Sequence, residues 1–338
     1  MLVTTSGRFP IVSNGQHPLR AAVEEWRARV TPTPEAAWQD TELRAVQAET
    51  QAELLAAQSE AGADILDTGY VPVYDEWFQM ARAAPDLEVA APLRYLDTNT
   101  YYHHWVLDKV PKRNGESPIV SAYRHAASLT DVPLKPTLFG PYTIYAYADR
   151  QGPGDTPEAF AALVDMWAAD VAALAAAGAK YVQIEESVVL RPKHRADFPL
   201  VAQAVERIAS AAPDTTVVVH LACGEIGDLL LPFLEIPGLG GLGLDFTDAY
   251  RAPNLAALKQ WRGDTFLQAG IADARSIRVE TEADLHETLN AISANVPAER
   301  CWAAPSTTLL HLPRHAAFEK LAKLASAAHS FNGKRTLP

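Results

Sequence analysis

Short apolar segments recur along the whole chain, and longer segments with helix start signals separate them. Most of the short segments are apolar at every position instead of at alternate positions. That pattern is typical of parallel strands covered on both faces. The order predicts an α/β fold built from repeated strand–helix units. The expected strands are residues 2–5, 63–69, 87–93, 134–140, 180–187, 215–222, 241–246, 265–271 and 301–306.

Helix start and stop signals lie between these strands. Thr33 and Thr156 each precede a proline that can occupy the first helical position. Thr281 and Asp284 have the spacing of a capping box. The alanine-rich segment 158–177 is expected to end at the glycine that follows it, because glycine commonly closes a helix.

The length of 338 residues suits one (β/α)8 TIM barrel, so residues 1–338 are expected to form a single barrel domain. No Gly-x-Gly-x-x-Gly motif follows the first strand, and a dinucleotide-binding fold therefore has no support. There are nine candidate segments for the eight strands of such a barrel. Residues 87–93 are the segment least expected to form a barrel strand. His103 and His104 are assigned to an aromatic loop.

Charge and composition narrow the class of partner. Lys and Arg total 29 against 41 Asp and Glu, and the net charge of −12 disfavours nucleic acid and anionic membranes as partners. No apolar stretch approaches the roughly eighteen residues that span a bilayer, and the first residues lack a signal-peptide pattern. With only Cys223 and Cys301, no disulfide framework is expected. We expect a cytoplasmic protein that acts on a small molecule, with its oligomeric state open.

In such barrels the chemistry lies at the carboxyl ends of the strands. Glu185 and Glu186 end one strand, and alternation directs one carboxylate into the barrel mouth and the other outward. An inward carboxylate can hold an ammonium group or act as a base. His220, Cys223 and Asp245 follow the next two strands and offer ligand types that zinc accepts. Spacing alone does not distinguish a zinc site from a strand end that happens to contain these residues.

Seven motifs, taken in order, resemble the cobalamin-independent methionine synthase family, whose barrel is of the methionine synthase and uroporphyrinogen decarboxylase type. They are TTSGRFP, AGADILDTGYVPVYDEWFQM, LDTNTYYHHW, KPTLFGPYTIYAY, AGAKYVQIEESVVL, LQAGIADARSIRVE and CWAAPSTTLLHLP. The resemblance implies methyl transfer from methyl-tetrahydrofolate, or another methyl donor, to the thiol of homocysteine, with zinc lowering the pKa of that thiol. It also implies that Glu185 binds the amino acid, and it adds Asp67, Asn99, Tyr101 and Arg8 as candidate substrate-binding residues.

This sequence departs from the family at the positions of the zinc ligands. The family has His-x-Cys where His220 is followed by Leu and Ala, so Cys223 comes one place late. Thr307 stands where the family has its last zinc cysteine, and Glu185 replaces the usual aspartate. His220, Cys223 and Asp245 remain as candidate zinc ligands, but the set is incomplete.

Two alternatives stay open beside methyl transfer. The first is a non-catalytic, single-barrel relative that binds folate or a partner subunit. The incomplete ligand set favours it, as does a likeness to the inert first barrel of the long enzymes. The second is a tetrapyrrole decarboxylase, whose site needs arginines near the first strand, where this chain offers Arg8.

Overall fold

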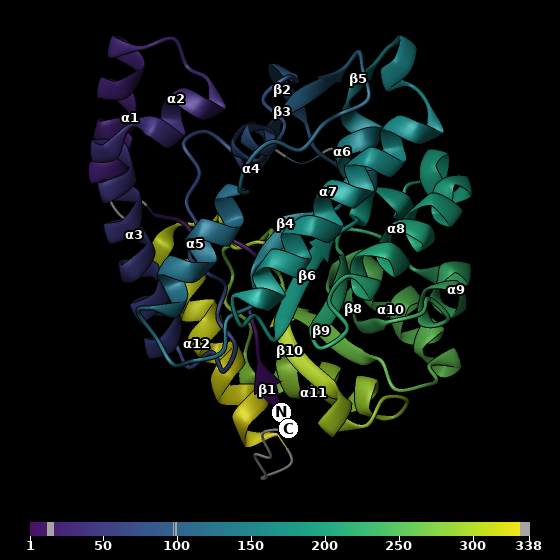
Figure 1. Cartoon of the computed structure of the whole chain (residues 1–338). Coiled ribbons are helices and arrows are strands. Elements are labelled where there is room, and N and C mark those ends of the chain that lie inside the picture. The colour runs from purple at the N-terminus through teal and green to yellow at the C-terminus, as the bar shows by residue number, and fades with distance from the viewer. Residues whose placement is uncertain (12–16, 97, 99, 332–338) are drawn as a thin grey trace.

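The computed structural model describes residues 1–11, 17–96, 98 and 100–331. Within them, a seven-stranded sheet curls through the centre of the molecule, and all its neighbouring strands are parallel (Figure 1). Its order is β1 (Leu2–Val3), β10 (Cys301–Pro305), β9 (Phe266–Ala272), β8 (Leu239–Asp245), β7 (Thr216–Leu221), β6 (Tyr181–Glu185) and β4 (Thr137–Phe139). The prediction of parallel strands is therefore confirmed for seven of the expected segments.

The segment 64–67 lies between the two edges of this sheet. Thr4, just after β1, forms an isolated parallel bridge with Ile65, and Leu66 forms one with Leu134, just before β4. Backbone hydrogen bonds of 2.8 to 3.1 Å accompany both bridges. The strand expected here is present only as these two bridges, which link β1 to the β4 edge.

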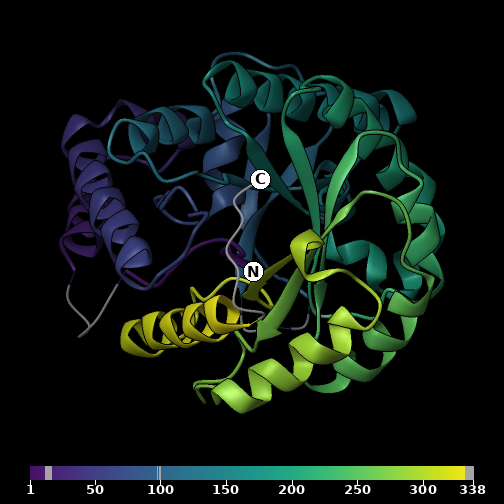
Figure 2. The ribbon, with the colours of Figure 1, turned by 90° about the horizontal axis from the view of Figure 1, so that it is seen from below.

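Helices surround the sheet, as the view from below shows (Figure 2). The strands β6 to β10 are buried at nearly every position, which explains their uniformly apolar sequences. The helices are α1 (Pro18–Arg29), α2 (Pro34–Gln39), α3 (Thr41–Glu60), α4 (Glu76–Met80), α5 (Pro118–Ala127), α6 (Pro141–Tyr147), α7 (Pro157–Ala176), α8 (Phe198–Ser210), α9 (Leu230–Leu234), α10 (Asp248–Ala257), α11 (Glu282–Ser293) and α12 (Arg314–Ser330).

The predicted helix ends are confirmed. The side chains of Thr33 and Thr156 accept hydrogen bonds from backbone N–H groups of the first turns of α2 and α7. Thr281 and Asp284 form the complete capping box of α11. After α7, Gly178 adopts φ +99°, a conformation that side chains rarely adopt.

Helix α7 corrects one expectation. By length and composition it is apolar enough to cross a membrane, although no segment was expected to be. However, 56% of its most apolar window is buried inside the molecule, where α7 packs against α6 and α8. It is a core helix of this fold.

The interior of the curled sheet changes character along the strands. At the amino ends it holds an apolar cluster of Leu2, Ile65, Val218 and Trp302, with Tyr181 and Phe266 packed against it. Alternate residues of a strand share a face, so Gln183 and Glu185 follow Tyr181 into the interior, and Gln268 follows Phe266. The interior is therefore apolar at the amino ends and polar toward the carboxyl ends.

A second, three-stranded sheet consists of β2 (Glu88–Arg94), β3 (Tyr101–Leu107) and β5 (Asp149–Arg150). β2 and β3 pair antiparallel, and β3 pairs parallel with β5. The loop assignment of His103 and His104 was therefore wrong, because both lie within β3. Segment 87–93 does form a strand, but it belongs to this sheet. The run of aromatic residues that suggested a loop is also typical of a half-buried strand.

Candidate active site

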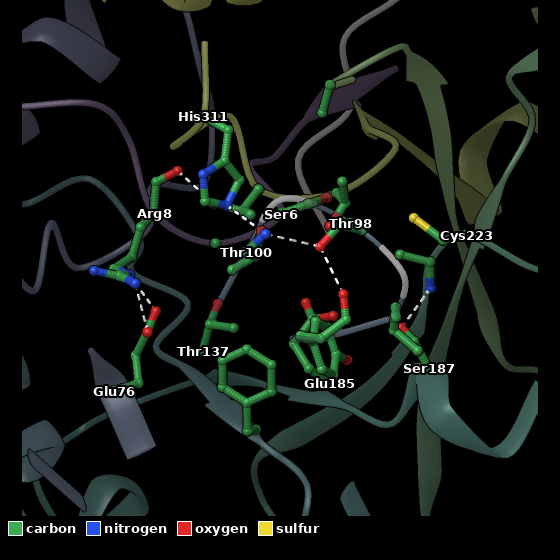
Figure 3. A pocket seen from close by; sticks show the side chains of 18 of the residues that line it. Ser6, Arg8, Glu76, Thr98, Thr100, Thr137, Glu185, Ser187, Cys223 and His311 are labelled. Carbon is green, nitrogen blue, oxygen red and sulfur yellow. Dashed lines mark hydrogen bonds and ion pairs between the residues drawn. The ribbon is translucent and has the colours of Figure 1, made fainter. Parts of the chain in front are cut away.

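A cavity of about 820 Å³ opens at the carboxyl ends of the main strands (Figure 3). Side chains that follow different strands converge on it, and residues near β2 and β3 form part of its wall. This is where parallel α/β sheets place their ligands. The polar lining includes Ser6, Arg8, Asp67, Glu185, Cys223 and Arg275.

Glu185 ends β6 and lines the cavity, as alternation predicted. Figure 3 shows it between the Arg8–Glu76 pair on one side and Cys223 on the other. Gln183 Nε2 donates to its Oε1 at 2.5 Å, and His220 Nδ1 lies 2.9 and 3.0 Å from its two oxygens. These contacts hold the carboxylate in one orientation.

Glu186 points away from the cavity and caps α6. Its carboxylate accepts hydrogen bonds from the backbone N–H groups of Tyr142 and Thr143, both at 2.9 Å, and from Thr143 Oγ1 at 2.7 Å. Burial raises its pKa to about 7. Gly140 leaves the necessary room, because a Cβ there would lie 2.0 Å from Glu186 Oε1. Of the two adjacent glutamates, Glu185 therefore lines the cavity and Glu186 caps the amino end of α6.

Two further carboxyl groups line the cavity on the side of β1. Burial raises the pKa of Asp67 to about 6, although the backbone N–H of Gly69 donates to it. Burial also raises the pKa of Glu76 to about 6, against the opposing effect of Arg8, whose Nη2 lies 2.5 Å from its Oε2. Arg8 is thus paired with Glu76 at the cavity wall. Glu76, on α4, was not singled out from the sequence.

The aromatic candidates are placed differently from the expectation. Tyr101 is 55% exposed and lies outside the cavity, while its neighbour Tyr102 is buried and lines it. Asn99 lies outside the described residues. Two lining tyrosines that were not among the candidate residues, Tyr70 and Tyr95, have buried hydroxyls without a hydrogen-bond partner among the residues described. A bound ligand can supply that partner.

A buried lysine supports the floor of the site. Lys135 is fully buried, and its Nζ donates to the Oε1 atoms of Gln183 and Gln268. Burial lowers its pKa to about 7, and Glu185 and Asp67 partly offset this effect. The same Gln183 donates to Glu185, so the lysine is linked to the cavity carboxylate through one amide.

Of the three candidate metal ligands, His220 and Asp245 form hydrogen bonds with other side chains. His220 is fully buried, with Nδ1 on Glu185, and its Nε2 has no partner in the described part of the chain. Asp245 accepts from Thr247 N at 2.9 Å and from Thr247 Oγ1 at 2.6 Å, and the backbone N–H of Cys223 donates to it at 3.3 Å. Cys223 adopts φ +56°, and burial raises its pKa to about 11.

These residues do not fit a zinc site. The described ranges contain no group of three or more His, Cys, Asp or Glu side chains placed to hold a metal ion. Arg275 Nη2 lies 3.6 Å from Asp245 Oδ2, so a fixed cation already stands beside one of the candidate ligands. Thr307 lines the cavity and carries no thiol. We therefore assign no step to a metal.

Comparison with known proteins identifies relatives over most of the chain. Residues 67–297 match the family described as cobalamin-independent synthase, N-terminal domain. A 5-methyltetrahydropteroyltriglutamate–homocysteine methyltransferase of Halalkalibacterium halodurans is 27% identical over 255 residues, covering 73% of this chain and 33% of that protein. The enzyme of that name from Streptomyces avermitilis is 30% identical over 256 residues, covering 73% and 32%. The chain spans about a third of the length of these relatives.

Solved structures share the fold. A B12-independent methionine synthase from Shewanella sp. W3-18-1, in complex with selenomethionine, superposes with a TM-score of 0.79 at 16% identity, covering 97% of this chain and 96% of that one. A methyltransferase from Methanosarcina mazei superposes with a TM-score of 0.63 at 14% identity, covering 96% and 94%. Both likenesses extend over the curled sheet and the helices around it.

Proposed function

Because this chain belongs to the cobalamin-independent methionine synthase family, we propose that it transfers a methyl group from a methyltetrahydrofolate-type donor to the thiol of homocysteine. The observation that carries the proposal is the fixed carboxylate of Glu185 inside a cavity of about 820 Å³. A carboxylate in that position binds the ammonium group of an amino acid, and a cavity of this size holds ligands of drug-like dimensions. Tyr70 and Tyr95 offer hydroxyls to the donor.

Transfer of a methyl group from nitrogen to sulfur also moves a proton. The S–H bond breaks and an S–C bond forms, while the C–N bond breaks and the donor nitrogen gains the proton. Asp67 and Glu76 line the cavity with pKa values raised to about 6, so each can accept a proton from a thiol and return it to the donor. This proton path uses only side chains of the chain itself.

The proposal is tested with the purified chain, a methyltetrahydropteroyltriglutamate donor and homocysteine. We expect methionine to form, and Glu185→Gln to weaken homocysteine binding by about 1–3 kcal/mol, the scale of a hydrogen bond to a charged group. Glu225→Gln makes the same chemical change on an exposed loop and should alter nothing. Calorimetry measures the binding, and methionine is followed by chromatography. A folded Glu185→Gln protein with unchanged affinity would remove Glu185 from the site.

A second candidate is a non-catalytic relative that binds the folate or a partner subunit. Two observations favour it: the matched family domain is the N-terminal one, and the described residues contain no group of three His, Cys, Asp or Glu side chains placed to hold a metal ion. The two functions differ in a single-turnover experiment with protein in excess over donor. Tight donor binding without any methionine would support the non-catalytic function.

We also propose that segment 64–67 completes an eight-stranded (β/α)8 barrel, and that residues 1–338 form one cytoplasmic domain. The bridges of Ile65 and Leu66 to the two edges of the sheet support the closure. If the barrel closes, the amide hydrogens of this segment should exchange as slowly as those of β1. Fast exchange confined to 64–67 would indicate an open sheet.

A further inference from the structure

Arg275 follows β9 and lines the cavity with a side chain that is 30% exposed. Its Nε donates to Asp273 Oδ1 at 3.1 Å, and its Nη2 donates to Thr247 Oγ1 at 2.6 Å, with Asp245 Oδ2 at 3.6 Å. The ring of Tyr250 lies 5.2 Å from the guanidinium carbon. The other terminal nitrogen, Nη1, makes no hydrogen bond with any residue the structure describes. The guanidinium is held in place while two of its donors remain available.

Opposite charges face the same part of the cavity. Cys223 lies within electrostatic reach of Glu185, Arg275 and Arg191, since all three contribute to the shift of its pKa, after burial and Asp245. Glu185, Arg275 and Arg191 also line the one cavity. Arg191 donates through Nη2 to the carbonyl oxygen of Leu96 at 2.8 Å, whereas Arg275 is held through both Nε and Nη2 and is therefore the more firmly placed of the two cations. A carboxylate and a fixed guanidinium around a neutral thiol suit a zwitterion.

We propose that Arg275 binds the α-carboxylate of the amino-acid methyl acceptor while Glu185 holds its ammonium group. The inference rests on the proposed function and adds the residue that recognises the carboxylate of its acceptor. The planar guanidinium matches the two oxygens of a carboxylate, whereas a thiolate presents a single atom. The carboxylates of Asp245 and Asp273 hold the Arg275 guanidinium in one orientation.

The test compares methionine with 3-(methylthio)propylamine, which has the same side chain and amine but no carboxylate. Neither compound has a thiol, so binding is measured by calorimetry without turnover. Arg275→Gln should weaken methionine binding by roughly tenfold or more, as expected for a lost hydrogen bond to a charged group, and leave the amine unaffected. The affinity of Arg275→Lys for methionine should lie between those of the wild type and Arg275→Gln. Arg278→Gln, the same change on an exposed side chain three residues away, should leave both affinities unchanged.

Three results would overturn the inference. Equal weakening of both ligands in Arg275→Gln would show a role in the shape of the pocket. Unchanged methionine binding in a folded Arg275→Gln protein would remove Arg275 from the ligand. Weakened homocysteine binding only above the pH at which its thiol ionises, with methionine unaffected, would assign Arg275 to the thiolate. Failure of the proposed function has a different signature: the wild-type chain forms no methionine, whatever its ligand preference.

Discussion

Replacing Gly140 with alanine should destabilise the protein strongly, although its backbone angles of φ −73° and ψ 154° are ordinary for alanine. At such positions the change normally stabilises a protein by about 0.4–1 kcal/mol, through the unfolded chain. Here the new Cβ would lie 2.0 Å from Glu186 Oε1 and 2.1 Å from its Cδ. The buried carboxylate must move, and it then gives up its three hydrogen bonds to Tyr142 and Thr143.

The magnitude follows from those contacts. A buried donor left without its partner costs about 1–3 kcal/mol, and overpacking alone costs about 1–3 kcal/mol. We therefore expect Gly140→Ala to lose about 3–5 kcal/mol, and Glu186→Ala to lose a similar amount because it removes the same acceptor. In the double variant the added methyl group no longer meets a carboxylate. Its stability should equal that of Glu186→Ala alone, so the coupling energy has the magnitude of the Gly140→Ala loss, about 3–5 kcal/mol.

Urea unfolding of the wild type, the two single variants and the double variant at pH 8 measures this cycle. The midpoints should shift while the slope with urea stays constant, which indicates the same unfolded surface in all four. Additive losses in the double variant would refute the reasoning, since they would mean that Gly140 and Glu186 act independently. A neutral or stabilising Gly140→Ala would refute it more directly.

Two further outcomes follow from the buried groups. The folded pKa of Lys135, about 7, lies below its unfolded value of about 10.5, so the unfolded state binds more protons between these values. Wild-type stability should therefore gain up to about 1.4 kcal/mol per pH unit from pH 7 to 10.5 relative to Lys135→Met. Parallel curves for the two proteins in urea titrations would contradict this. Protein incubated with zinc and then dialysed should retain no stoichiometric metal by elemental analysis. Retained zinc that is lost in Cys223→Ser would contradict our conclusion that His220, Cys223 and Asp245 do not form a zinc site.

Much of the main sheet could be predicted, because a strand buried on both faces has an apolar sequence without alternation, as β7 and β9 show. The opposite directions of Glu185 and Glu186 also follow from the two-residue period of a strand. Strand β3 was missed, and residues 87–93 were counted toward the main sheet, because local composition does not reveal which strand pairs with which.

The site was harder to predict, for a related reason. Lys135 contacts Gln183 and Gln268, 48 and 133 positions away, and Arg8 contacts Glu76, 68 positions away. No local motif indicates such contacts. The direction of the Cys223 side chain depends on a left-handed backbone conformation, and a spacing rule for metal ligands does not predict that conformation.

The cavity is built from two separate parts of the fold. The central strands supply its carboxylates, and the three-stranded sheet supplies one of its walls. Glu185 and Asp67 stand at the carboxyl ends of the central segments, whereas Tyr95, Leu96 and Tyr102 reach the cavity from the β2–β3 hairpin. The hairpin has no strand in the main sheet, but its Tyr95 and Tyr102 pack against Phe139 of β4, so aromatic contacts connect it to the central strands. For an engineer, substitutions at the hairpin positions that line the cavity would reshape this wall, while the buried aromatic side chains of β3 have to be kept for its packing.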